Sequence, residues 1–134
     1  MNACAWILKT EPNTYGWNDL VNEGIAIWDG VRNYRARNFM KEMKLGQNAL
    51  IYHSGKKREI VGIAEVIEEA FQDPTDETGK FVAVKIKAIR KLVNPISLEK
   101  IKGIDAMQDS LLLKQSRLSV IPISAEQYHS LIEV

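Results

Sequence analysis

The sequence predicts an α+β domain built on a twisted, barrel-like mixed sheet of about six strands, with short helices at its rim. Two observations predict this class. Apolar or alternating runs typical of strands are spread along the whole chain, over residues 5–9, 25–28, 48–53, 60–70, 81–92 and 118–121. The segments between them do not alternate regularly between strand and helix, which argues against a doubly wound parallel sheet.

Helices are expected where apolar residues recur at helical spacing behind a capping residue. The clearest is 33–44, where Ala36, Phe39, Met40 and Met43 share one face. The others are shorter: 17–22 between Gly16 and Gly24, 98–102 after Ser97, 105–112 from Asp105, and a last one to residue 132, opened by the capping box Ser124 to Gln127.

The length and composition predict one domain over residues 1–134. The chain is 46% hydrophobic and 26% charged, with a net charge of +1. It contains one cysteine, Cys4, which fits a reducing compartment. No long apolar run and no signal peptide is apparent, so we expect a cytoplasmic monomer without a membrane partner.

The net charge conceals a strong asymmetry along the chain. Residues 30–58 carry eight basic side chains and one acid, whereas 59–79 carry seven acids and no base. This pattern favours a basic patch, although a solvated helix face and a charged loop explain it as well. Arg32 and Arg35 lie at the electrostatically unfavourable start of the 33–44 helix, which suggests a bound anion or a nearby carboxylate such as Asp29.

The residues with catalytic or metal-binding chemistry form no recognisable motif. His53, His129 and Cys4 lie far apart in sequence, so no metal site is expected. No glycine-rich run opens a helix, which argues against a phosphate loop or a dinucleotide cofactor. His53 and Ser54 are neighbours on a strand and point to opposite faces, which makes a catalytic dyad improbable.

The most informative segment is 28–38, with the sequence WDGVRNYRARN. It combines an aromatic ring, two amides and three arginines, which are the groups that hold a flat base on a phosphate backbone. Trp28 ends a strand before a basic helix, whereas Trp6 and Trp17 lie on elements that read as core. The run Tyr52 to Ser54 ends another strand and could face the same cleft, or else Tyr52 packs in the core and His53 is a satisfied surface group.

Five blocks of the chain together resemble a known family. They are WILKTEP at 6–12, the 28–38 segment, YHS at 52–54, IVGIAE at 60–65 and RLSV at 117–120. In this order they are similar to the EVE domain, which the thymocyte nuclear protein group also carries. The resemblance covers nearly the whole chain and implies a PUA-like fold, a small twisted β-barrel with helices around it.

The resemblance also implies a non-catalytic module that reads a modified base, such as methylated or hydroxymethylated cytosine or methylated adenine, in DNA or RNA. The base is expected to stack on Trp28 while its edge is read by polar groups. The expected base pocket consists of Trp28, Lys9, Glu11, Asn33, Tyr52, His53, Ser54, Arg117 and Ser119. Flanking phosphates are expected on Arg32, Arg35, Arg37, Lys56, Lys57 and Arg58.

This sequence departs from the family pattern at three places. Thr10 stands where serine is common, Ser116 replaces a frequent glycine, and the 73–81 segment is short, which affects base preference most. An alternative function is that of the ASCH-type relatives, hydrolysis of nucleosides or RNA, with Lys9 and either Glu11 or His53 as acid and base. A small-molecule or protein-interaction module is a third possibility.

Overall fold

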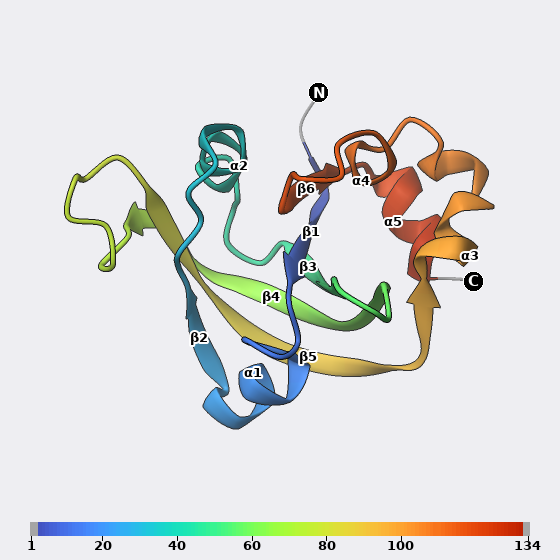
Figure 1. The fold of residues 1–134 in the computed structure, drawn as a ribbon, viewed down its shortest axis with the longest axis horizontal. Helices are drawn as coiled ribbons and strands as arrows, with labels where there is room; N and C mark the ends of the chain where they lie inside the picture. Colours follow the sequence, from blue (N-terminus) through green and yellow to red (C-terminus); the bar gives the residue numbers. More distant parts are fainter. Residues whose placement is uncertain (1–2, 133–134) are drawn as a thin grey trace.

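A computed structural model describes residues 3–132, and its centre is one six-stranded sheet of order β2-β5-β4-β3-β1-β6 (Figure 1). β1 and β3 are parallel, and the other neighbours are antiparallel, so the sheet is mixed as expected. The strands are β1 (Ala5–Thr10), β2 (Ile25–Trp28), β3 (Asn48–His53), β4 (Glu59–Gln72), β5 (Val82–Ser97) and β6 (Val120–Ile123).

The helices lie around the sheet rather than between successive strands. α1 lies at one side of the sheet, α2 at another, and the C-terminal helices gather at one end of the molecule (Figure 1). The helices are α1 (Trp17–Glu23), α2 (Tyr34–Met40), α3 (Leu98–Lys102), the 3-10 turn η1 (Asp105–Met107), α4 (Leu111–Lys114) and α5 (Ala125–Ile132).

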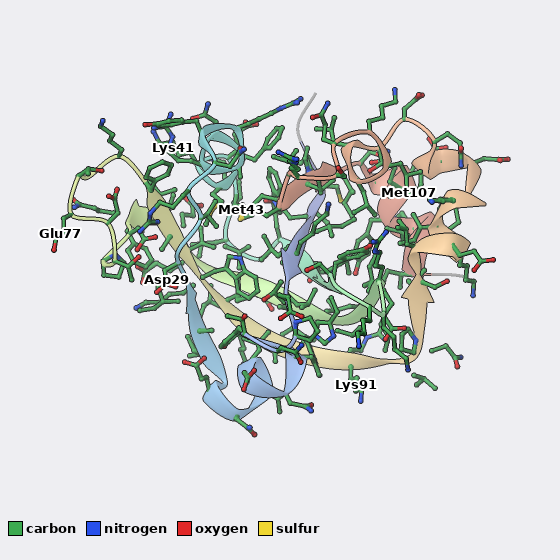
Figure 2. The ribbon with its side chains drawn as sticks, viewed as in Figure 1. Asp29, Lys41, Met43, Glu77, Lys91 and Met107 are labelled. Carbon is green, nitrogen blue, oxygen red and sulfur yellow. The ribbon has the colours of Figure 1, made fainter. Side chains whose placement is uncertain are left out.

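One apolar core joins the sheet to these helices. Trp6, Ile7 and Leu8 of β1 are almost completely buried, as are Met40 and Met43. Met43 lies just after the end of α2 (Figure 2). The Trp6 indole donates to Gln47 Oε1 at 2.7 Å, so its polar atom is paired inside the core. Both Trp6 and Trp17 are core residues, as the sequence predicted.

Several predicted boundaries shift in the structure. The predicted 33–44 helix ends at Met40, and the chain continues through turns in which the Lys44 N–H donates to Gln47 Oε1. The predicted 105–112 helix is two short elements, η1 and α4, because Ser110 caps a new helix through the Leu112 N–H. The predicted 81–92 strand continues to Ser97 because register shifts let the long β4–β5 pair bend.

The hydrogen-bonded sheet does not close into a complete barrel. β2 pairs only with β5 and β6 only with β1 among the described strands, so these two strands are the edges of the sheet. β6 tolerates Pro122 because it is an edge strand. Within residues 3–132 no helix is long and apolar enough to cross a membrane.

Candidate functional site

A cleft of about 800 Å³ opens between the edge strand β2 and the end of β1. Its volume lies within the range of ligand-binding pockets, roughly 300–1,000 Å³. Among the described strands, β2 pairs only with β5, so its other side is an open edge of the sheet, and the cleft lies along this edge. The lining residues are Lys9, Thr10, Thr14, Tyr15, Glu23, Ile25, Ile27, Trp28, Asp29, Gly30, Val31, Arg32, Asn33 and Ser119.

Two aromatic rings form one corner of the cleft. The rings of Tyr15 and Trp28 meet at 81° with their centroids 5.9 Å apart. Trp28 is only 8% exposed, so most of its ring packs in the core. The Tyr15 hydroxyl donates to Glu23 Oε1. Desolvation raises the pKa of Tyr15, and the hydrogen bond to Glu23 raises it further, so its hydroxyl stays protonated.

Lys9 and the segment before β6 form the opposite side of the cleft. The Lys9 backbone N–H donates to the Ser119 carbonyl at 2.9 Å, and its Nζ donates to the Ser116 carbonyl at 3.1 Å. Lys9 Nζ also lies 5.8 Å from the centroid of the Tyr52 ring. Desolvation lowers the pKa of Lys9. Two residues that are far apart in sequence, Lys9 and Ser119, therefore meet at this side of the cleft.

A buried carboxylate holds the loop between β2 and α2. Asp73 is fully buried and accepts from the Gly30 N–H at 2.8 Å, from Arg32 Nη1 at 3.0 Å, and from the Thr75 N–H and hydroxyl at 2.7 and 2.6 Å. Desolvation raises the pKa of Asp73, but these hydrogen bonds outweigh it and hold the pKa at about 2. Gly30 has a φ of +79°, which favours glycine in this turn.

The carboxylate that pairs with Arg32 is therefore Asp73 and not Asp29. Arg32 also donates to the Thr75 hydroxyl at 2.9 Å and lies over the Phe81 ring. Desolvation raises the pKa of Asp29, and the negative charge of Asp73 adds to this effect. Asp29 stands at the end of β2, where the chain turns toward α2 (Figure 2).

The start of α2 borders the cleft and is capped by Asn33. Asn33 Oδ1 accepts from the Ala36 N–H at 2.9 Å, which leaves the amide NH₂ for other contacts. Arg37 donates to the Lys80 carbonyl and to Asn38 Oδ1. The Arg35 guanidinium forms no hydrogen bond or ion pair within residues 3–132 and lies over the Phe39 ring. Of the three predicted arginines of this segment, Arg35 thus has its donors free.

Five of the nine predicted pocket residues lie outside the lining of the cleft, and four of these are in or next to the ends of β1 and β3. Tyr52 is buried in the core, and Ser54 is held by its backbone N–H on the Thr10 carbonyl. His53 Nε2 accepts from the Trp17 N–H at 3.1 Å, and desolvation lowers the pKa of His53. Glu11 Oε2 accepts from the Asn13 N–H at 3.1 Å. These contacts hold the turn that leads into α1 against the end of β3.

The remaining basic residues lie elsewhere. Arg117 is exposed in the segment before β6 and does not line the cleft. Lys56, Lys57 and Arg58 are exposed in the turn between β3 and β4, and this turn is separate from α2 in Figure 1. The predicted phosphate-binding residues therefore divide between two places on the surface instead of forming one patch.

Two other features bear on the possible chemistry. Among residues 3–132 no group of three or more histidine, cysteine or carboxylate side chains is arranged to hold a metal ion. A second hollow of about 540 Å³ lies between α1 and β5, lined in part by Val21, Ile25, Ile89 and Arg90. It contains none of the residues that the sequence marked as binding residues.

Comparisons with known proteins place this geometry in a family. The model of the EVE domain matches residues 4–134. The chain belongs to the EVE domain family. It is 33% identical to thymocyte nuclear protein 1 of Danio rerio, over 96% of this chain and 71% of that protein. The predicted family and the PUA-like α+β fold are therefore confirmed, with a sheet that stays open at its edges.

Solved structures of similar proteins superpose closely on this chain. Rpa0253 from Rhodopseudomonas palustris is 43% identical with a TM-score of 0.90, and the alignment covers 97% of this chain and 91% of that one. The human THYN1 protein, solved in complex with DNA containing 5-methylcytosine, is 28% identical with a TM-score of 0.89, over 96% and 95% of the two chains. An ASCH structure from Zymomonas mobilis, 12% identical with a TM-score of 0.58 over 98% and 95%, shares the fold alone.

Sequence reasoning missed part of this EVE cleft. Tyr15 and Glu23 belong to no sequence motif, and their contact depends on the turn before α1. Asp73 was read as one member of an acidic loop, although a local signal was available. Two successive Asp-x-Thr triplets begin at Asp73 and Asp76, and in each the aspartate accepts from the threonine N–H and hydroxyl.

Proposed function

We propose that this EVE domain is a non-catalytic reader that holds a single unpaired or flipped modified base in the cleft between β2 and β1. The observation that carries the proposal is the cleft of about 800 Å³ with the aromatic corner of Trp28 and Tyr15. Base–aromatic stacking contributes about 1–3 kcal/mol per base. The human THYN1 complex with 5-methylcytosine DNA supports DNA with a modified cytosine as the first ligand to test.

The limited exposure of Trp28 shapes this proposal. A ring that is 8% exposed offers a base only part of its surface. We therefore infer that Tyr15 is the second aromatic contact and that its ring adjusts when a base enters. Within the described part of the chain, the Asn33 amide NH₂ and the Arg35 guanidinium make no hydrogen bond. Asn33 is the proposed polar contact at the mouth of the cleft, and Arg35 is the proposed phosphate contact.

The contacts of the residues suggested for hydrolysis support a non-catalytic role. Lys9 Nζ donates to the Ser116 carbonyl, His53 Nε2 accepts from the Trp17 N–H, and Glu11 accepts from the Asn13 N–H. Each of these groups is thus engaged with the protein instead of with another member of the suggested acid–base pair. The ASCH alternative rests on the shared fold, which does not transfer an activity.

A neighbouring pair of surface residues offers a sharp test of the cleft. Thr14 and Asn13 are both exposed, but Thr14 lines the cleft and Asn13 does not. We expect Thr14→Trp to fill the cleft and to weaken binding of a fluorescent single strand with one 5-methylcytosine at least about tenfold. Asn13→Trp is the matched control and should change the affinity less than about twofold.

Three outcomes of these binding and activity measurements would contradict the proposal. If the two tryptophan variants bind the strand with equal affinity, the base does not bind in this cleft. Absence of binding to every modified oligonucleotide at low salt would refute the reader function itself. Turnover of a nucleoside or of RNA that is lost in Lys9→Ala would favour the hydrolase instead.

A further inference from the structure

The charged side chains that line the cleft differ in whether they already have hydrogen-bond partners in the protein. This difference affects which base the cleft can accept. Its cations have donors committed to the protein: Lys9 Nζ to the Ser116 carbonyl, and Arg32 to Asp73 and Thr75. Among the described residues, the Asp29 carboxylate accepts a hydrogen bond from nothing but its own backbone. Within residues 3–132, Asp29 is therefore the one charged side chain in the lining of the cleft that has no hydrogen bond to another residue.

Carboxylates at a nucleic-acid site require an explanation, because they repel phosphate. Lys9 and Arg32 balance Glu23 and Asp29, so the charged side chains that line the cleft sum to zero. A neutral base fits such a lining, whereas a phosphate is better placed outside it, near Arg35. An acceptor-only group inside the cleft favours a base edge that carries a hydrogen-bond donor.

A reader of methylated cytosine has to distinguish it from thymine, and this requirement identifies which donor of the base the cleft should recognise. 5-Methylcytosine and thymine have the same methyl group on the same ring, so stacking and methyl burial cannot separate them. They differ at ring position 4, where cytosine has an amine that donates and thymine has a carbonyl that accepts. A reader of methylated cytosine in DNA must reject thymine, and rejection needs a repulsive element as well as an attractive one.

We propose that Asp29 is the residue that selects an amine-bearing base and rejects thymine. This inference rests on the proposed function and adds the base edge that the cleft reads. The Asp29 carboxylate accepts a hydrogen bond from the exocyclic amine of the methylated cytosine. With thymine, the same carboxylate faces the carbonyl oxygen at position 4, and two acceptors meet without a hydrogen between them.

Asp29→Asn tests this role directly, because the amide offers an acceptor on one side and a donor on the other. The experiment measures the affinity for two otherwise identical single strands with one 5-methylcytosine or one thymine in the same flanks. We expect the unaltered protein to prefer 5-methylcytosine about tenfold or more, which corresponds to about 1.4 kcal/mol. In Asp29→Asn the preference should fall below about threefold, mainly because thymine binds more tightly.

The exposed Asp105 in η1 provides the matched control, and Asp105→Asn should leave the preference unchanged. Asp29 is also exposed, so its variant is expected to fold, and a measurement of its thermal midpoint checks this. A preference that stays the same in Asp29→Asn overturns the inference, as does a preference below threefold in the unaltered protein. If binding of both strands survives Thr14→Trp, the proposed cleft is wrong and the role of Asp29 is lost with it. If Thr14→Trp abolishes binding while Asp29→Asn keeps the preference, only the role of Asp29 is wrong.

Discussion

Asp73 shows at the scale of a residue how a single buried group can organise a site. It joins the loop after β2 to the loop between β4 and β5 by accepting from Gly30, Arg32 and Thr75. We expect Asp73→Asn to lower the free energy of unfolding at pH 7 by about 1.5–3 kcal/mol, because hydrogen bonds to a charged acceptor are lost. Chemical denaturation measures this loss, and Asp105→Asn is the exposed control.

The pH dependence of stability gives Asp73 a second signature. Its pKa is lowered from 3.8 to about 2 in the folded protein. A lowered pKa stabilises the fold above pH 3.8, and this stabilisation is lost as the pH falls toward 2. The stability of Asp73→Asn should therefore decline less between pH 4 and pH 2 than that of the unaltered protein. Parallel declines would show that Asp73 does not carry this share of the acid sensitivity.

Gly62 is a residue whose size matters more than its conformation. A Cβ at this position would lie 2.5 Å from the Trp17 ring, and the buried ring has little room to move. We expect Gly62→Ala to cost about 1–3 kcal/mol of stability through overpacking. Gly103→Ala, where the nearest atom lies at 3.5 Å, is the control and should stay within about 0.5 kcal/mol. Similar thermal midpoints for both variants would contradict this packing.

At the scale of elements, the cap of α2 links stability to the cleft. Asn33→Ala removes the hydrogen bond to the Ala36 N–H and should cost about 1 kcal/mol. Ser97 caps α3 in the same way through the Lys100 N–H at 3.1 Å, far from the cleft. Ser97→Ala should therefore lose similar stability and keep the affinity for the methylated strand, whereas Asn33→Ala should weaken it. If the two variants bind the methylated strand with equal affinity, Asn33 is not part of the binding site.

Local sequence signals predicted elements well where one short segment decides the structure. The capping box of Ser124 and Gln127 and the cap at Ser97 appear as expected, because their hydrogen bonds span three residues. The end of the helix at Met40 was missed because Gln47 competes for the Lys44 N–H. Chain reversals and tertiary contacts of this kind leave no periodic pattern.

The candidate site was less predictable for the same reason. Trp28 and Asn33 line the cleft because they flank one turn, which the sequence marks by Asp29 and Gly30. Tyr52 and His53 end the strand next to Lys9, but Tyr52 packs in the core and His53 binds the start of α1. Which side of a strand end faces a cleft depends on packing from elements far away in the sequence.

At the scale of the whole molecule, the small net charge hides separate groups of basic residues. If phosphates bind beside the cleft through Arg35 and one or two further cations, the slope of log affinity against log salt should lie between about −1 and −2 for a single strand. Arg35→Gln should reduce the magnitude of the slope by about 0.7, and Lys102→Gln in the distant α3 should leave it unchanged. A slope of about −4 would require about six phosphate contacts and would show that the Lys56–Arg58 turn also binds the strand.

The open sheet is the feature of the whole molecule that creates the proposed binding site, because the cleft lies where the sheet does not close. The most direct test is an NMR titration of the ¹⁵N-labelled protein with a short strand that contains one 5-methylcytosine. We predict that the largest shift changes fall on the Trp28 indole, Tyr15 and Ser119, with small changes in the 56–58 turn. Changes confined to the hollow between α1 and β5, or no changes at low salt, would contradict the claim that this cleft holds the base.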